Sequence, residues 1–140
     1  MTSIAVVPGF DLWPQALDRE AQEALVAAVM AAGEVAPFTH YDTPMGKPMS
    51  VAMSSFGPLG WVSDKDGYRY ADRAPNGTRP WAPMPAALDD LWRTLGDADT
   101  PADACLINRY RDDARMGLHQ DRDEADPRFP VLSISLGDTA

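Results

Sequence analysis

Two residues that could bind a metal ion stand close together in the last quarter of the 140-residue sequence. His119 and Asp121 are separated by one residue, and side chains two positions apart in an extended chain point to the same face. An imidazole and a carboxylate would then converge without help from any other element. Because two histidines and one carboxylate on one face form the site typical of non-haem Fe(II) oxygenases, the pair could supply two of three metal ligands.

The pair alone is a weak signal, because a His-x-Asp spacing arises easily by chance in a sequence with 21 acidic residues and 2 histidines. The second histidine, His40, lies between Thr39 and Tyr41. That setting is typical of a surface or loop histidine and not of a third ligand. The evidence for a metal site therefore depends on the segments that surround the pair.

Several segments along most of the chain match, in order, the pattern of one enzyme family. They are residues 49–53 (MSVAM), 59–61 (LGW), 67–70 (GYRY), 80–85 (PWAPMP), 103–110 (DACLINRY), 118–121 (LHQD) and 131–137 (VLSISLG). Together these segments resemble the AlkB family of Fe(II)- and 2-oxoglutarate-dependent dioxygenases, close to the bacterial AlkB group, which removes alkyl lesions from nucleic-acid bases. So many ordered matches are more specific than any single motif.

The resemblance implies an α+β fold, a double-stranded β-helix (jelly roll) with N-terminal helices packed on the sheet and a nucleotide-recognition lid. Residues 1–140 would form a single domain, with the lid at about 43–84 and the first part of the catalytic jelly roll at about 103–140. The family's second metal histidine and its 2-oxoglutarate-binding arginines follow the strand matched by residues 131–136. Because a jelly roll uses about eight strands, we expect an incomplete jelly roll from a longer protein, catalytically incompetent or nearly so.

The resemblance also implies roles for individual residues. His119 and Asp121 would bind Fe(II), with no catalytic residues beyond these metal ligands. Asn108 and Tyr110 would hydrogen-bond the cosubstrate 2-oxoglutarate, since donors of this type suit a dicarboxylate. Dioxygen would complete the reaction, which would release succinate, carbon dioxide and an aldehyde and leave a repaired base.

The same resemblance implies a set of substrate contacts. Trp61 and Tyr68 fall where the family places base-stacking and substrate-contacting aromatic residues. A modified base cannot reach buried iron inside a duplex, so it would be flipped out or presented in a single strand. The other implied contacts are Met49 and Met53 on the lid strand, Asp123 at the base edge, and Arg115 and Arg122 near the phosphates. Composition alone favours another interpretation, in which residues 54–84 are a Pro-rich loop whose aromatic residues fill a small core.

The predicted activity is therefore oxidative dealkylation (demethylation) of alkylated DNA or RNA bases. The partners would be single-stranded or double-stranded alkylated DNA, with RNA as a further candidate, and the complete protein would be a monomer. One alternative is another 2-oxoglutarate oxygenase, acting on protein or a small molecule, which would not need Trp61 and Tyr68 for stacking. Another is a non-catalytic nucleic-acid-binding remnant.

The formal net charge of -9 argues against a nucleic-acid partner, because phosphate binding needs a positive surface. The charge is unevenly distributed, however. Residues 47–81 carry five Lys and Arg residues against three Asp residues. Asp112 and Asp113 place two acids close to the predicted metal segment. We therefore expect weak, salt-sensitive contact with nucleic acid on the side of residues 47–81.

Three further features indicate a cytoplasmic protein with no membrane contact. No apolar run approaches the roughly 18 residues of a membrane helix. The first residues lack the basic start of a secretory signal. The single Cys105 has no internal disulfide partner and lies in an apolar strand pattern, which is typical of a buried, reduced thiol.

The elements that must position these residues can be predicted from periodicity. We expect strands at residues 4–7, 49–53 and 104–110, and helices at about 14–32, ended by Gly33, and 85–95, ended by Gly96. Alternation along 104–110 places Leu106, Asn108 and Tyr110 on one face and Cys105, Ile107 and Arg109 on the other. The two predicted cosubstrate residues would therefore point the same way.

Overall fold

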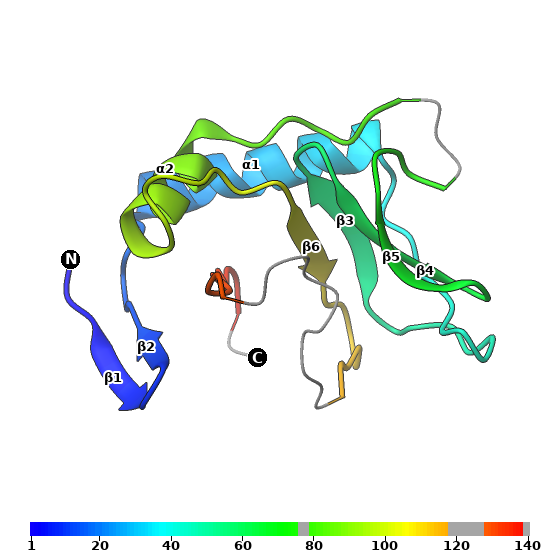
Figure 1. Cartoon of the computed structure of the whole chain (residues 1–140), viewed down its shortest axis with the longest axis horizontal. Coiled ribbons are helices and arrows are strands. Elements are labelled where there is room, and N and C mark those ends of the chain that lie inside the picture. Colours follow the sequence, from blue (N-terminus) through cyan, green and yellow to red (C-terminus); the bar gives the residue numbers. More distant parts are fainter. Residues whose placement is uncertain (76–78, 118–127, 139–140) are drawn as a thin grey trace.

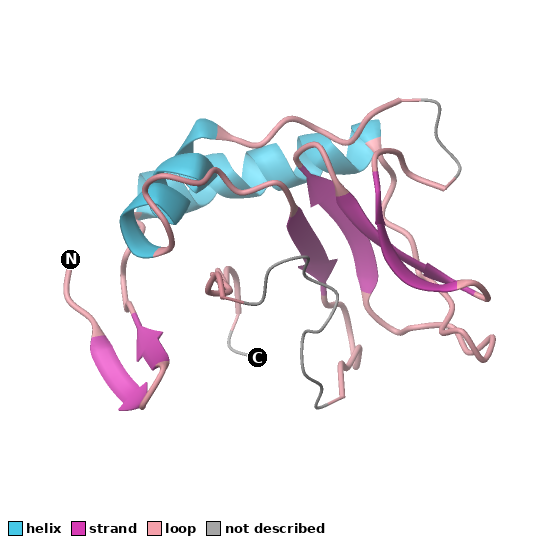
Figure 2. Cartoon of the chain, viewed as in Figure 1, coloured by secondary structure: helices cyan, strands magenta, loops and turns pink. Residues whose placement is uncertain are grey.

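The computed structural model describes residues 1–75, 79–117 and 128–138, and these residues form two helices and three two-stranded antiparallel sheets. The elements in chain order are β1 (Ile4–Val7), β2 (Phe10–Leu12), α1 (Arg19–Val35), β3 (Ala52–Phe56), β4 (Gly60–Asp64), β5 (Gly67–Ala71), α2 (Ala86–Leu95) and β6 (Cys105–Arg109). The sheets pair β1 with β2, β3 with β6, and β4 with β5. Figure 1 shows α1 running across one end of the β3–β6 pair, and Figure 2 shows the helices on one side and the strands on the other.

Helix α1 begins and ends later than the periodicity predicts. Its first turn forms after Asp18, whose carboxylate accepts a hydrogen bond from the Ala21 amide at 2.8 Å, as an N-cap does. Gly33 was predicted to end the helix, and this was wrong, because α1 continues through it to Val35. A β-carbon on Gly33 would lie 2.7 Å from Cε2 of the Phe38 ring, which is too close for two carbon atoms in contact. Gly33 therefore allows a close approach and is not a stop signal.

Strand β3 is displaced from the predicted strand at residues 49–53, since it covers Ala52–Phe56. It pairs with β6 from Ala52 opposite Arg109 to Phe56 opposite Cys105. Ser54 and Ser55 are buried within it, and the Ser54 hydroxyl donates to the Ala36 carbonyl at 2.7 Å. Because serine is polar, the sequence indicated that the strand ended at Met53, before Ser54 and Ser55.

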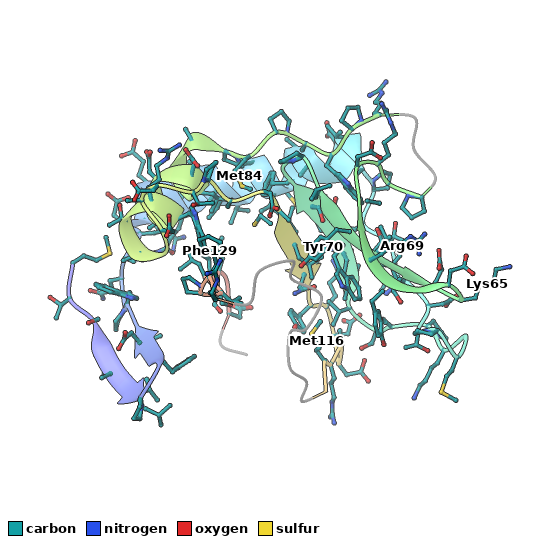
Figure 3. All side chains as sticks on the ribbon, in the orientation of Figure 1. Lys65, Arg69, Tyr70, Met84, Met116 and Phe129 are labelled. Atoms are coloured by element: carbon teal, nitrogen blue, oxygen red, sulfur yellow. The ribbon has the colours of Figure 1, made fainter. Side chains whose placement is uncertain are left out.

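Residues 54–84 contain a regular hairpin that periodicity did not predict. Strands β4 and β5 pair with Trp61 opposite Tyr70 and Ser63 opposite Tyr68. At its tip Arg69 donates to both carboxylate oxygens of Asp64 at 2.9 Å, and this bond lowers the pKa of Asp64. Figure 3 shows Lys65 extending from this tip away from the rest of the molecule.

The core is divided by the β3–β6 pair into two clusters on its opposite faces. The helix-side cluster consists of Leu25, Ala32, Phe56, Ala82, Leu88 and Ile107. The hairpin-side cluster consists of Ala36, Tyr41, Val51, Met53, Val62 and Trp81. The helices thus cover one face of the pair, and the β4–β5 hairpin packs on part of the other.

The predicted strand at residues 131–136 is wrong, because the structure assigns no strand there. Ile134 and Leu136 instead pack against the helix-side cluster. The prediction of β1 is confirmed, and β1 and β2 form a hairpin whose residues are all exposed. Among the described residues no helix is long and apolar enough to cross a membrane.

Gly60 gives a direct test of packing in the hairpin-side cluster. A β-carbon there would lie 2.1 Å from Cε2 of Trp81, whose indole is 4% exposed and donates to the Ala71 carbonyl at 2.8 Å. We expect Gly60→Ala to lower the free energy of unfolding by about 1–3 kcal/mol, because the indole cannot move without losing its contacts. Urea denaturation followed by circular dichroism measures this.

Gly117→Ala is the matched control, because a β-carbon on Gly117 would meet nothing within 4 Å. We expect the free energy of unfolding of this variant to change by less than about 0.5 kcal/mol. Equal unfolding free energies for the two variants would contradict the packing argument.

Candidate functional site

The predicted alternation along β6 is confirmed by exposure. Leu106, Asn108 and Tyr110 are exposed, with Tyr110 at 53%, while Ile107 between them is buried. Tyr110 directly follows the last residue of β6. The amide of Asn108 and the phenol of Tyr110 are therefore accessible together, as the cosubstrate prediction requires.

The register of the β3–β6 pair connects this exposed face to the hairpin. Met53 stands directly opposite Asn108, and cross-strand partners project from the same face of a sheet. Met53 is 2% exposed and belongs to the hairpin-side cluster, against which Trp61 and Met49 pack. Met53 is thus a packing residue of the hairpin-side cluster, whereas Met49 is only half-buried.

Three aromatic side chains form a row, here called the aromatic ladder, from the core to the surface. Trp61 on β4 and Tyr68 on β5 are stacked, with ring centroids 5.3 Å apart and planes at 19°. Tyr41 contacts Trp61 from the core side, at 6.3 Å and 75°. Burial raises the pKa of Tyr41 to about 12, so its phenol stays neutral, while Tyr68 is 48% exposed. The predicted pairing of Trp61 and Tyr68 in one place is therefore present, and Tyr41 is a member that sequence reasoning missed.

An open depression of about 690 Å³ lies beside the outer end of the ladder. It is lined by Thr43, Pro44, Met45, Lys47 and Tyr68. Lys47 contributes a cation and Tyr68 an exposed aromatic ring to the same depression, although the two residues lie far apart in sequence. This combination suits a ligand with a flat ring and a negative group.

Arg115 is exposed, and its backbone is bound to the loop before β3. The Ser50 hydroxyl donates to the Arg115 carbonyl at 2.9 Å and accepts from the Arg115 amide at 2.8 Å. A turn at Asp112 (φ 53°) brings the chain back to that loop after Tyr110. Ser50 lies inside a segment that carries the family resemblance, yet nothing in the sequence marks its hydroxyl as a contact.

Four of the predicted site residues lie outside the residues that the structure describes: His119, Asp121, Arg122 and Asp123. Their roles stay predictions. Within residues 1–75, 79–117 and 128–138 no group of three or more His, Cys, Asp or Glu side chains could hold a metal ion. His40 is exposed and its Nδ1 lies 3.0 Å from the Met49 carbonyl oxygen, in agreement with its prediction as a loop histidine.

Cys105 takes no part in this arrangement. It is half-buried at the start of β6 and packs against the helix-side cluster. Burial raises the pKa of its thiol to about 11. Since the thiolate is the reactive form, the side chain is a packing group at neutral pH and not a nucleophile.

Comparison with known proteins agrees with these observations. The chain is 69% identical over 137 residues to an alpha-ketoglutarate-dependent dioxygenase AlkB homolog of Caulobacter vibrioides (strain NA1000 / CB15N), covering 98% of this chain and 62% of that protein. It is 41% identical over 121 residues to the alpha-ketoglutarate-dependent dioxygenase AlkB of Escherichia coli (strain K12), covering 84% of this chain and 56% of that protein. The chain thus spans about three fifths of the length of these relatives.

The resemblance to AlkB that the sequence segments predict is confirmed by these matches. The family model described as the 2OG-Fe(II) oxygenase superfamily matches residues 9–140, and so includes the aromatic ladder, β6 and the His119-x-Asp121 pair. On this match, the chain belongs to the 2OG-Fe(II) oxygenase superfamily.

Proposed function

We propose that the natural protein containing this sequence removes alkyl groups oxidatively from nucleic-acid bases, using Fe(II), 2-oxoglutarate and dioxygen. The observation that carries the proposal is the β3–β6 register, which sets Asn108 opposite Met53, a member of the cluster against which Trp61 packs. The names of the relatives support it, since they are called alpha-ketoglutarate-dependent dioxygenases. When bound, iron and 2-oxoglutarate supply the oxidation of the alkyl carbon by dioxygen.

The described residues fit the cosubstrate. Asn108 and Tyr110 offer exposed, uncharged hydrogen-bond donors on one side of β6, and Leu106, the other residue on that side, is apolar. The dianion 2-oxoglutarate would therefore face hydrogen-bond donors on this side of β6, and β6 itself contains no carboxylate that would repel it. His119 and Asp121 would hold the metal, because an imidazole and a carboxylate two residues apart can bind one ion when the chain between them is extended.

The aromatic ladder fits a nucleobase. Tyr68 covers one face of the Trp61 indole, so the two rings support each other as a rigid surface for stacking. Stacking accepts any base and orients its plane. Lys47, beside Tyr68 in the depression, would contact the adjoining phosphate. A base that is flipped out of a duplex or presented in a single strand could reach this surface.

The remaining predicted contacts belong to the same proposal. Met49, half-buried beside the hairpin-side cluster, would touch the substrate at the edge of the ladder. Asp123 would accept a hydrogen bond from an exocyclic amine, and Arg115 and Arg122 would contact phosphates. With a net charge of -9, binding would depend on these few cations and would weaken steeply as salt is raised.

We also propose that residues 43–84 act as a nucleotide-recognition lid and that β6 is part of a catalytic jelly roll. The contacts between the loop of residues 39–49 and the hairpin support a common unit, since the Ser63 hydroxyl on β4 donates to the Asp42 carbonyl at 2.6 Å. Superfamily membership supports the jelly roll.

The proposal is tested with the natural full-length protein that contains this sequence. It is incubated with Fe(II), 2-oxoglutarate and a single-stranded oligonucleotide that carries one methylated base. We expect succinate and formaldehyde in equal amounts, together with loss of the methyl group by mass spectrometry, and none of these without iron or 2-oxoglutarate. Succinate without demethylation of either DNA or RNA would indicate a different substrate, and absence of succinate would contradict oxygenase activity.

A further inference from the structure

One hydroxyl group joins two parts of the candidate site that are 65 residues apart in sequence. Ser50 Oγ accepts from the Arg115 amide at 2.8 Å and donates to the Arg115 carbonyl at 2.9 Å. Both backbone groups of Arg115 are thus satisfied by a single side chain, in the way that a neighbouring strand would satisfy them. We name this pair of hydrogen bonds the Ser50 latch.

The segment that the latch holds is docked by a second contact. Ala114, the residue before Arg115, packs against the hairpin-side cluster. Its amide donates to the Arg111 carbonyl at 3.0 Å, which closes the turn after β6. Asp112 in this turn has a positive φ of 53°, a conformation that Asp tolerates better than most residues. The chain after Tyr110 is therefore reversed and fixed against the loop before β3.

Ser50 is itself held firmly on the other side. Its neighbour Val51 is 1% exposed, in the hairpin-side cluster. Its other neighbour, Met49, donates its amide to the Tyr41 carbonyl at 2.8 Å and accepts from His40 at its own carbonyl. Because Tyr41 is the inner member of the aromatic ladder, the backbone beside Ser50 is bonded directly to the ladder's base.

The contacts therefore run without a break from the aromatic ladder through the loop of residues 41–50 to Arg115. We propose that Ser50 is a positioning residue, whose hydroxyl fixes residues 110–115 at a set distance from the aromatic ladder. This rests on the proposed function, in which the ladder holds the base and Tyr110 contacts the cosubstrate. The latch keeps oxidation coupled to a correctly placed base.

The test compares three variants of the natural full-length protein. Ser50→Ala removes both hydrogen bonds, Ser50→Thr keeps the hydroxyl, and Thr94→Ala is the control. The control loses the hydroxyl-to-carbonyl bond from Thr94 to Asp90, of 2.8 Å, which lies within α2 and involves neither the aromatic ladder nor Arg115. Each variant is assayed for succinate formed, bases repaired and hydrogen exchange at the Arg115 amide.

In Ser50→Ala we expect about tenfold faster exchange at the Arg115 amide, since the loss of both hydrogen bonds lets the segment open more often. The ratio of repaired bases to succinate should fall by about threefold or more, because oxidation then proceeds with a misplaced base. Ser50→Thr should restore the ratio, and Thr94→Ala should keep it.

Two results would overturn the proposal. A wild-type ratio in Ser50→Ala would show that the latch does not position the reaction, and an equal fall in Thr94→Ala would show that the fall does not depend on the latch. Failure of the proposed function is distinguishable from both. It would appear as absence of succinate or of repair in the wild type, and exchange at Arg115 would then still decide whether the Ser50 latch forms.

Discussion

Replacing His119 by alanine is expected to weaken metal binding by about 100-fold or more and to abolish succinate formation. Loss of a neutral imidazole removes one of the few protein ligands that such a site can offer, and loss even of a residue that only orients a ligand costs about 10–100-fold in metal affinity. Anaerobic titration of the natural full-length protein with Mn(II), followed by calorimetry, measures the affinity without relying on turnover. Asp121→Ala is expected to weaken Mn(II) binding and to abolish succinate formation in the same way.

The chain itself offers a matched control, since it has 2 histidines. His40 is exposed, and its Nδ1 lies 3.0 Å from the Met49 carbonyl oxygen. His40→Ala should therefore leave the Mn(II) affinity unchanged. A loss of affinity in His40→Ala as large as in His119→Ala would contradict the assignment of His119 as the ligand.

Replacing Trp61 by alanine is expected to reduce base repair by about 10–100-fold while turnover of 2-oxoglutarate continues. The estimate follows from the worth of one base-aromatic stack, about 1–3 kcal/mol. Trp61 is the middle member of the aromatic ladder, so its loss also removes the support of Tyr68. The measurements are kcat/KM for a methylated oligonucleotide and, separately, succinate formation without it.

Trp92→Ala is the control for loss of a tryptophan. Trp92 lies on α2 and is half-buried, and its indole donates to the Thr100 carbonyl at 2.7 Å. Its truncation therefore disturbs the loop after α2 and none of the ring contacts of the aromatic ladder. Repair per folded molecule should remain at the wild-type level in this variant. If Trp61→Ala lost succinate formation and repair in equal measure, Trp61 would support the fold and not the base.

Sequence patterns correctly predicted the elements that depend on interactions between residues close in sequence, such as α2 and β6. Helix α2 follows the expected bounds, because Leu88 and Leu91 recur at helical spacing and Gly96 ends it. The two faces of β6 follow from a period of two alone. In α1 the cap at Asp18 and the packing of Phe38 on Gly33 overrode the apolar pattern.

Contacts between distant segments could not be predicted from the sequence. An alternating apolar run such as residues 131–136 reports that side chains will be buried, and it does not report whether a strand edge is free to pair with it. The β4–β5 hairpin was missed because its aromatic residues share the strands with Asp64 and Arg69, whose ion pair lies at the tip. The Ser50 latch depends on two loops that meet in space, so the candidate site was predicted as a set of residues without the contacts that join them.

The pairing of Met53 with Asn108 also has a consequence for how the protein folds. The stacked rings of Trp61 and Tyr68 are joined by a short hairpin, a local contact of the kind that forms within microseconds. The alignment of β3 with β6 requires closure of a long loop that includes the hairpin and α2, and non-local pairing of this kind is slow. The contact between Trp61 and Tyr68 is therefore expected to form earlier in folding than the pairing of Met53 with Asn108.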